Sequence, residues 1–190
     1  MSSIKLKHSG GNSVILSAPS SNPAADRTIT LPGTANGELL TTTNPKDGNI
    51  IQVQHDFDTA SAAFSTSSLT YVTNSVLPTL AITPSSSSSK IYISAYIGMQ
   101  HDGLGQVENT IYRIISGGAT TDLSASNTYG LVFKGGTNPE WGYAGVQFVD
   151  SPNTTSQVTY TWYSRSEHGQ SVTPRMGGFG MAITLMEIAA

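Results

Sequence analysis

The sequence predicts an all-β protein, in which a short extended N-terminal β arm precedes a jelly-roll-like antiparallel β-sandwich. Three observations support this fold class. No apolar stripe at helical spacing lasts for three turns. Several short runs alternate apolar and polar residues, which is the pattern of strands with one buried face. Glycine, threonine, valine, tyrosine and isoleucine, which favour strands and turns, recur throughout the chain.

The N-terminal arm is predicted for residues 1–43. Their apolar residues alternate with polar ones in a few short runs, separated by glycine and proline turns. Because an isolated hairpin is marginal in water, these runs predict an arm that folds against a partner or against its own copies. A disordered tail is the alternative. Residues 44–49 contain a proline and an Asp-Gly turn but no apolar residue, and they predict a linker.

Residues 50–190 predict the sandwich knob, with eight to ten strands at the spacing typical of a sandwich or barrel. The expected strands are 50–57, 64–72, 76–82, 91–99, 107–115, 122–133, 141–149, 157–163 and 179–188.

Two of these stretches carry further predictions. In 91–99, the isoleucines, Ala95 and Met99 fall on one side, which predicts a core strand. The proline and five serines at 84–89 predict a neutral, solvated corner without chemistry. The strand at 179–188 is apolar on both faces, which predicts a central strand or a subunit interface, such as one around a trimer axis.

Composition excludes several classes of protein. Charged residues are 11% of the chain, and 26 serines and 23 threonines take their place. The net charge of −3 does not favour nucleic acid or anionic membrane as a partner. The absence of cysteine excludes disulfides. No apolar run is long enough to span a membrane or to form a signal peptide, so synthesis in a cytoplasm is expected. A surface with so few charges is typical either of a Ser/Thr-rich β protein or of a protein that is a subunit of a larger assembly.

Catalytic motifs are not found. The four histidines form no metal-binding pattern, and no nucleophile elbow or phosphate-binding loop occurs. The acids Glu108, Glu140, Asp150, Glu167 and Glu187 cannot be paired from the sequence into a glycosidase site. We therefore predict no enzyme, no catalytic or metal-binding residue and no cofactor.

Loop aromatics and histidines are the remaining candidates for ligand or receptor contact: His101, Asp102, Trp141, Tyr143 and His168. Aromatic rings beside polar groups stack on sugars or hold a protein partner. The alternative is that the tryptophans belong to the core and that the histidines are solvated strand-end residues.

Several segments together resemble tail-fibre-like surface structural proteins of phages that infect cyanobacteria and other aquatic bacteria. They are 3–16, 18–32, 64–72, 82–91, 150–156 and 183–190. The resemblance covers nearly the whole chain, and its motifs are structural rather than catalytic.

The resemblance implies a non-enzymatic, trimeric virion protein whose arm attaches to the particle while the β body faces outward. The expected attachment residues are Ile4, Leu6, Val14, Leu16, Ile29 and Leu31. The expected partners are other copies of the chain and another virion protein, either the major capsid protein or a tail component. The chain has no heptads or solenoid period for a fibre shaft. This favours a capsid-decoration (cement) protein or a short spike. The alternative is a host-receptor or glycan-binding module of the tail.

Overall fold

The computed structural model describes residues 3–7, 9–17, 20–21, 45–59, 62–101, 106–124, 127–136 and 138–190. The chain divides into two compact units, Met1–Leu39 and Leu40–Ala190. Each unit is described by itself.

The first unit contains a β-hairpin. Strands β1 (Ser3–Lys7) and β2 (Ser13–Ser17) pair antiparallel. Gly11 in the connecting turn has a φ of 100°, a left-handed conformation that glycine adopts without steric cost. The register aligns Ile4 with Leu16 and Leu6 with Val14. The hairpin thus forms from two of the short runs expected in the arm.

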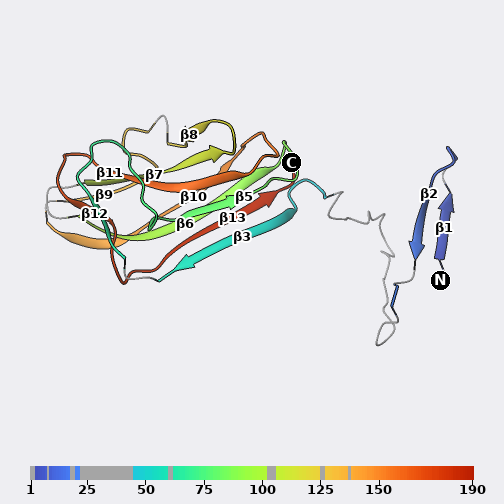
Figure 1. The fold of residues 1–190 in the computed structure, drawn as a ribbon, viewed down its shortest axis with the longest axis horizontal. Helices are drawn as coiled ribbons and strands as arrows, with labels where there is room; N and C mark the ends of the chain where they lie inside the picture. The colour runs from blue at the N-terminus through green and yellow to red at the C-terminus, as the bar shows by residue number, and fades with distance from the viewer. Residues whose placement is uncertain are drawn as a thin grey trace, which may run out of the picture. The chain divides into compact units, whose positions relative to one another are not determined.

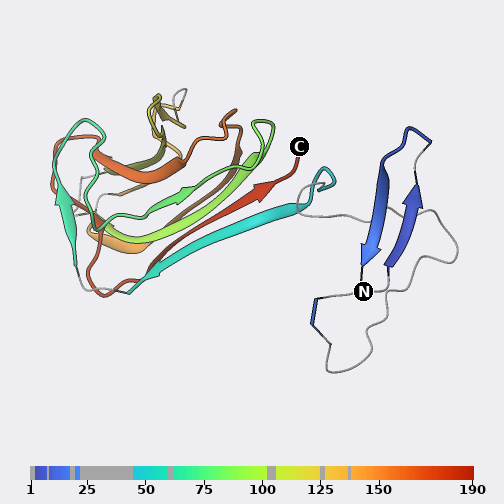
Figure 2. The same cartoon turned by 45° about the vertical axis from the view of Figure 1, so that its right-hand side comes forward.

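The second unit is a sandwich of two antiparallel sheets (Figures 1 and 2). Its strands are β3 (Ile50–Asp58), β4 (Phe64–Thr66), β5 (Thr79–Ile82), β6 (Lys90–His101), β7 (Gln106–Ile115), β8 (Thr120–Asp122), β9 (Val132–Gly135), β10 (Glu140–Asp150), β11 (Val158–Ser166), β12 (Val172–Arg175) and β13 (Met181–Ile188). The first sheet has the order β3-β13-β6-β12-β4, with β10 also paired to β6. The second has the order β5-β11-β7-β8, with β9 also paired to β7.

Several short strands lie end to end and share one position in a sheet. Strand β13 pairs with residues 90–96 of β6, and β12 pairs with residues 100–101 of the same strand. Likewise β3 and β4 pair with β13 and β12, and β8 and β9 pair with successive parts of β7. Numbered along the chain, the strand positions are ordered 1-8-3-6 in one sheet and 2-7-4-5 in the other. This wrapping, in which the chain alternates between sheets, is that of a jelly roll. It confirms the predicted fold class.

The core lies between the two sheets. In β6, Ile91, Ile93, Ala95, Ile97 and Met99 are all buried, as the period-2 pattern predicts. The second sheet supplies the other half of the core, in which Trp162 and Tyr160 are the largest side chains.

Two clusters of polar groups inside the sandwich are hydrogen-bonded. Asn109 Oδ1 accepts hydrogen bonds from Trp162 Nε1 at 2.9 Å and from Ser164 Oγ at 2.7 Å. Asp150 accepts hydrogen bonds from Tyr160 Oη and Arg113 Nη1, each at 2.7 Å. Burial and the neighbouring carboxylate raise the pKa of Tyr160. A buried polar group without a partner costs about 1–3 kcal/mol, so these pairs keep the interior stable.

Two of the expected strands differ from the structure, and one strand was missed. The strand expected at 64–72 is regular only at 64–66, because the following serine and threonine groups hydrogen-bond locally; Ser68 Oγ donates to the Thr70 carbonyl. The strand expected at 122–133 is two strands with turns between them. Strand β12 was not expected; it is short and contains Pro174.

The serine corner at 84–89 also differs from expectation. Ser85 donates through its backbone N–H and its Oγ to Glu187 Oε1, each at 2.7 Å. Ser89 is buried, and Ser88 Oγ donates to the Ala190 carbonyl. Ser85–Ser88 are exposed as predicted, but the corner also holds the end of β13 through these hydrogen bonds.

Candidate interaction surface

The outer face of the sheet formed by β3, β13, β6 and β10 exposes an unusual number of apolar and aromatic side chains. The residues on it are Val53, His55, Phe57, Tyr92, Ser94, Tyr96, Gly98, Gln100, Trp141, Tyr143, Gly145, Gln147, Val149, Thr173, Phe179, Ala182, Thr184, Met186 and Ile188. We call this surface the aromatic face.

Strand register assembles the aromatic face from segments far apart in the chain. One row across the sheet runs through Phe57, Ala182, Tyr96 and Gly145. Because directly opposed residues of antiparallel strands lie on the same face, period-2 alternation turns each row outward together. The intervening rows carry the core residues and point inward.

The rings on this face contact one another. The ring centroids of Tyr96 and Tyr143 are 6.0 Å apart, and those of Tyr143 and Phe179 are 5.4 Å apart. Phe179 lies over Gly98, where a Cβ would come within 2.4 Å of the Phe179 Cβ. His55 Nδ1 hydrogen-bonds with Thr184 Oγ1 at 2.9 Å. These contacts hold the exposed side chains of the face against one another.

Among the residues in these rows, Lys90 is the single Asp, Glu, Lys or Arg, and it pairs with Ile188 at one end of the face. The outer side of the opposite sheet differs, since Arg165 Nε there donates to the fully buried Glu108 at 2.5 Å. Charge is thus confined to one end of this outer face, whereas the other outer face carries a charged pair nearer its middle.

Two of the predicted ligand residues lie on the aromatic face. Trp141 is 67% exposed and Tyr143 is 61% exposed, both on β10. Of the two tryptophans, only Trp162 belongs to the core.

The other predicted ligand residues are not brought together with this pair. His101 is fully buried at the end of β6, which corrects its placement in an exposed loop and excludes a solvated ring. His168 is half-exposed beside Glu167, at 3.6 Å from it. Asp102 lies outside the described residues.

Among the predicted attachment residues, Ile4 is 64% exposed and Leu6 is 58% exposed on the hairpin. Val14 and Leu16 occupy the β2 positions that pair with them. Ile29 and Leu31 lie outside the described residues.

The five acids considered for catalysis have separate structural partners. Glu108 pairs with Arg165, Asp150 with Arg113 and Glu140 with Lys134. Glu187 accepts hydrogen bonds from Ser85 in the serine corner, and Glu167 Oε2 lies 3.6 Å from His168 Nε2. No group of three or more metal-binding side chains occurs within the described parts of the chain. Nor does this part of the structure contain a helix that is long and apolar enough to cross a membrane.

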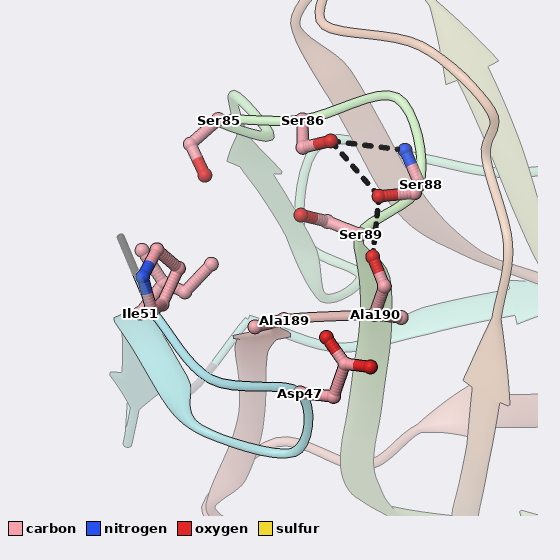
Figure 3. A pocket seen from close by; sticks show the side chains of 9 residues that line it. Asp47, Ile51, Ser85, Ser86, Ser88, Ser89, Ala189 and Ala190 are labelled. Carbon is pink, nitrogen blue, oxygen red and sulfur yellow. Dashed lines mark hydrogen bonds between the residues drawn. The ribbon is translucent and has the colours of Figure 1, made fainter. Parts of the chain in front are cut away.

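An open pocket of about 440 Å³ lies at the serine corner (Figure 3). Four serines, Pro45, Asp47, Ile51 and the last two alanines line it. Ser86 Oγ and Ser88 Oγ lie 2.9 Å apart, and the Ser88 hydroxyl is directed at Ala190. The Ser86 and Ser88 hydroxyls thus bond with one another and with the backbone of the last residue.

Most of the aromatic face was not predicted, including Val53, Phe57, Tyr96, Val149 and Phe179. Period 2 places Tyr96 on the side of β6 opposite to the core, and the same pattern holds for Val149 in β10. What the sequence does not reveal is that these strands are neighbours.

Comparisons with known proteins assign no family. No protein-family profile matches the chain, and no curated protein does. Two solved structures of infectious bursal disease virus, of the Gx and Gt strains, match 93% and 94% of this chain at 13% identity, each with a TM-score of 0.33. The match spans about half the length of their chains, 53% and 52%. A likeness this distant carries no argument about function.

Proposed function

We propose that this chain is a non-enzymatic structural protein of a phage virion. It forms a homotrimer on the particle as a capsid-decoration (cement) protein or a short tail fibre or spike. Its N-terminal arm anchors it to the major capsid protein or to a tail component, and the sandwich faces outward. The sequence resemblance described above supports this role.

The division of the chain into two units is the observation that carries the proposal. The sandwich closes its own core within residues 64–185. The hairpin is a two-stranded sheet that leaves Ile4, Leu6 and Ile15 exposed. Such a hairpin is marginal alone, and each of its two edges can accept a further strand. When the hairpin adds a strand of a particle protein to one of these edges, the new backbone hydrogen bonds provide the affinity.

The test is binding to particles that lack this protein, measured by co-sedimentation. Deletion of residues 1–43 should lower binding by about 100-fold or more, because three weak arms on one trimer act with avidity. The double change Ile4→Asp with Leu6→Asp should act in the same direction. Ser9→Asp with Asn12→Asp adds the same charge in the exposed turn and should bind normally. Full occupancy of the particle by the truncated chain would refute the anchoring role.

A second candidate function is a host-receptor or glycan-binding module. The exposed Trp141 ring favours it, since Gln100 and Thr173 lie in the same row of the face and offer uncharged hydrogen-bonding groups. A glycan array probed with the intact chain tests this candidate directly.

A further inference from the structure

We propose that the aromatic face is the surface through which copies of this chain bind one another. The inference rests on the homotrimer of the proposed function and names the surface that holds it together. Three properties of the face lead to this assignment: its size, its low charge and its chemical composition.

The size of the face suits a subunit contact. It spans four strands and about nine residues of β6, which gives a flat sheet area of about 500 Å². The side chains that project from the sheet add to this area. Exposed apolar patches of about 300–600 Å² on a monomer are already commonly functional. A standard interface takes about 800 Å² of accessible surface from each partner, so this face supplies most of one partner's share.

The charge of the face favours a second copy of the chain. Among the described residues, only Lys90 at one end of the face brings a charge to it. Around a three-fold axis the face of each copy meets parts of its two neighbours, and a face with little charge does so without like-charge repulsion. A strongly charged partner, in contrast, would find few groups of opposite sign on it.

The composition of the face matches the centre of an interface. Tyr, Trp, Phe and Met are enriched in interface cores, where charged residues are depleted. The rings reach across the sheet from Phe57 on β3 to Trp141 on β10, a width that exceeds the contact of a single sugar ring. Val53, Val149 and Met186 continue the apolar surface along the strands.

The two tryptophans make the proposal directly measurable. Trp162 is fully buried in the core, whereas Trp141 is 67% exposed in a single chain. Acrylamide quenching of fluorescence therefore reports on Trp141 and on the aromatic face. Sedimentation velocity of the same intact chain gives the mass of the assembly. The blue-shifted emission of Trp162 shows whether each variant is folded.

For the wild type we expect three times the 19.9 kDa of one chain, with both tryptophans protected from acrylamide. Tyr96→Lys with Tyr143→Lys should dissociate the assembly and raise the quenching of Trp141 several-fold, while Trp162 stays protected. Tyr129→Lys with Phe133→Lys is the matched control, since these rings are also exposed and lie 5.4 Å apart outside the aromatic face. The control should keep the mass and the protection of the wild type.

Three outcomes would overturn the proposal. One is a wild-type chain that sediments as a monomer. Another is an assembly in which acrylamide quenches Trp141 freely, which would leave the face open to a glycan or to a different virion protein. The third is an assembly that survives the Tyr96 and Tyr143 changes but not the control changes. None of these measurements uses the particle. Their result for the aromatic face is therefore independent of whether deletion of the arm abolishes binding to the particle.

Discussion

Glu187 is fully buried at the end of β13, where its carboxylate is surrounded by hydrogen-bond donors. Burial alone would raise its pKa, but hydrogen bonds from Gln52 and Ser85 outweigh it and hold the pKa below its ordinary value of 4.5. The unfolded chain therefore binds more protons than the folded chain between the two pKa values. The stability that Glu187 contributes is complete above pH 4.5 and is lost as the pH falls through the folded-state value.

Replacement of Glu187 by Gln tests this contribution. An amide cannot accept from both Ser85 and Gln52, so one donor loses its partner, and we expect a loss of about 1–3 kcal/mol at pH 7. The difference in Tm between wild type and variant should narrow as the pH is lowered from 5 to 3. Thermal unfolding followed by circular dichroism measures it. Asp56→Asn, at an exposed site on β3, should match the wild type at pH 7. If the two proteins have the same Tm at pH 7, or if their difference in Tm stays constant down to pH 3, the proposed contribution of the Glu187 carboxylate is contradicted.

Single residues were predictable where the period of a strand determines which way they face. Glu187 falls on the same side of β13 as Ile183 and Leu185, so its burial follows from alternation. The role of the five serines does not, because their acceptor comes from a strand about 100 residues later. His101 is buried for a similar reason: β6 continues two residues beyond the predicted strand and pairs there with β10 and β12.

At the scale of elements, the contact between β6 and the segment before β13 depends on a glycine. A Cβ at Gly98 would meet the Cβ of Phe179 at 2.4 Å and its ring at 2.7 Å. The first of these atoms is the root of the side chain, so rotation of the ring cannot relieve the clash. The Phe179 backbone would have to move, and with it the ring that packs on Tyr143.

We therefore expect Gly98→Ala to destabilise the sandwich by about 1–3 kcal/mol, a decrease in Tm of roughly 5 °C. Gly145→Ala is the matched control, because it lies on the same face of the neighbouring β10 and its added Cβ would meet the Ala95 carbonyl oxygen at an ordinary 3.5 Å. Differential scanning calorimetry at one fixed protein concentration compares the two. Equal Tm values for both variants would show that Phe179 does not depend on the gap at Gly98.

Strands that bury one continuous face were the predictable elements. Strands β6 and β10 alternate over nine or more residues, and their expected bounds differ from the observed ones by only one or two residues. The short strands were less predictable. β4, β8 and β12 have three or four residues each, and their strand conformation comes from pairing with neighbours rather than from their own pattern.

At the scale of the whole molecule, the all-β class and the sandwich followed from composition and periodicity, whereas the aromatic face did not. It requires the jelly-roll order, which places β10 beside β6 and β3 beside β13. Tyr96 and Tyr143, now in ring contact, are separated by almost fifty residues. A pattern within one strand shows two faces, but only the sheet order shows which outward faces join into one surface.

The separation of the chain into two units has a thermodynamic consequence for the whole molecule. The core cluster of the described residues lies within residues 64–185, and we predict that the sandwich folds without the arm. Deletion of residues 1–43 should therefore leave the Tm of the sandwich within about 2 °C of its value in the full chain, when both are measured by calorimetry at equal concentration. The unfolding enthalpy of the truncated chain should also be close to that of the full chain, because an isolated two-stranded hairpin has little cooperative structure to lose. Gly98→Ala in the truncated background provides the comparison, since it should lower the Tm by the same amount as in the full chain. A large fall in Tm on truncation would mean that the arm packs on the sandwich. In that case loss of particle binding could no longer be attributed to an anchor acting on its own.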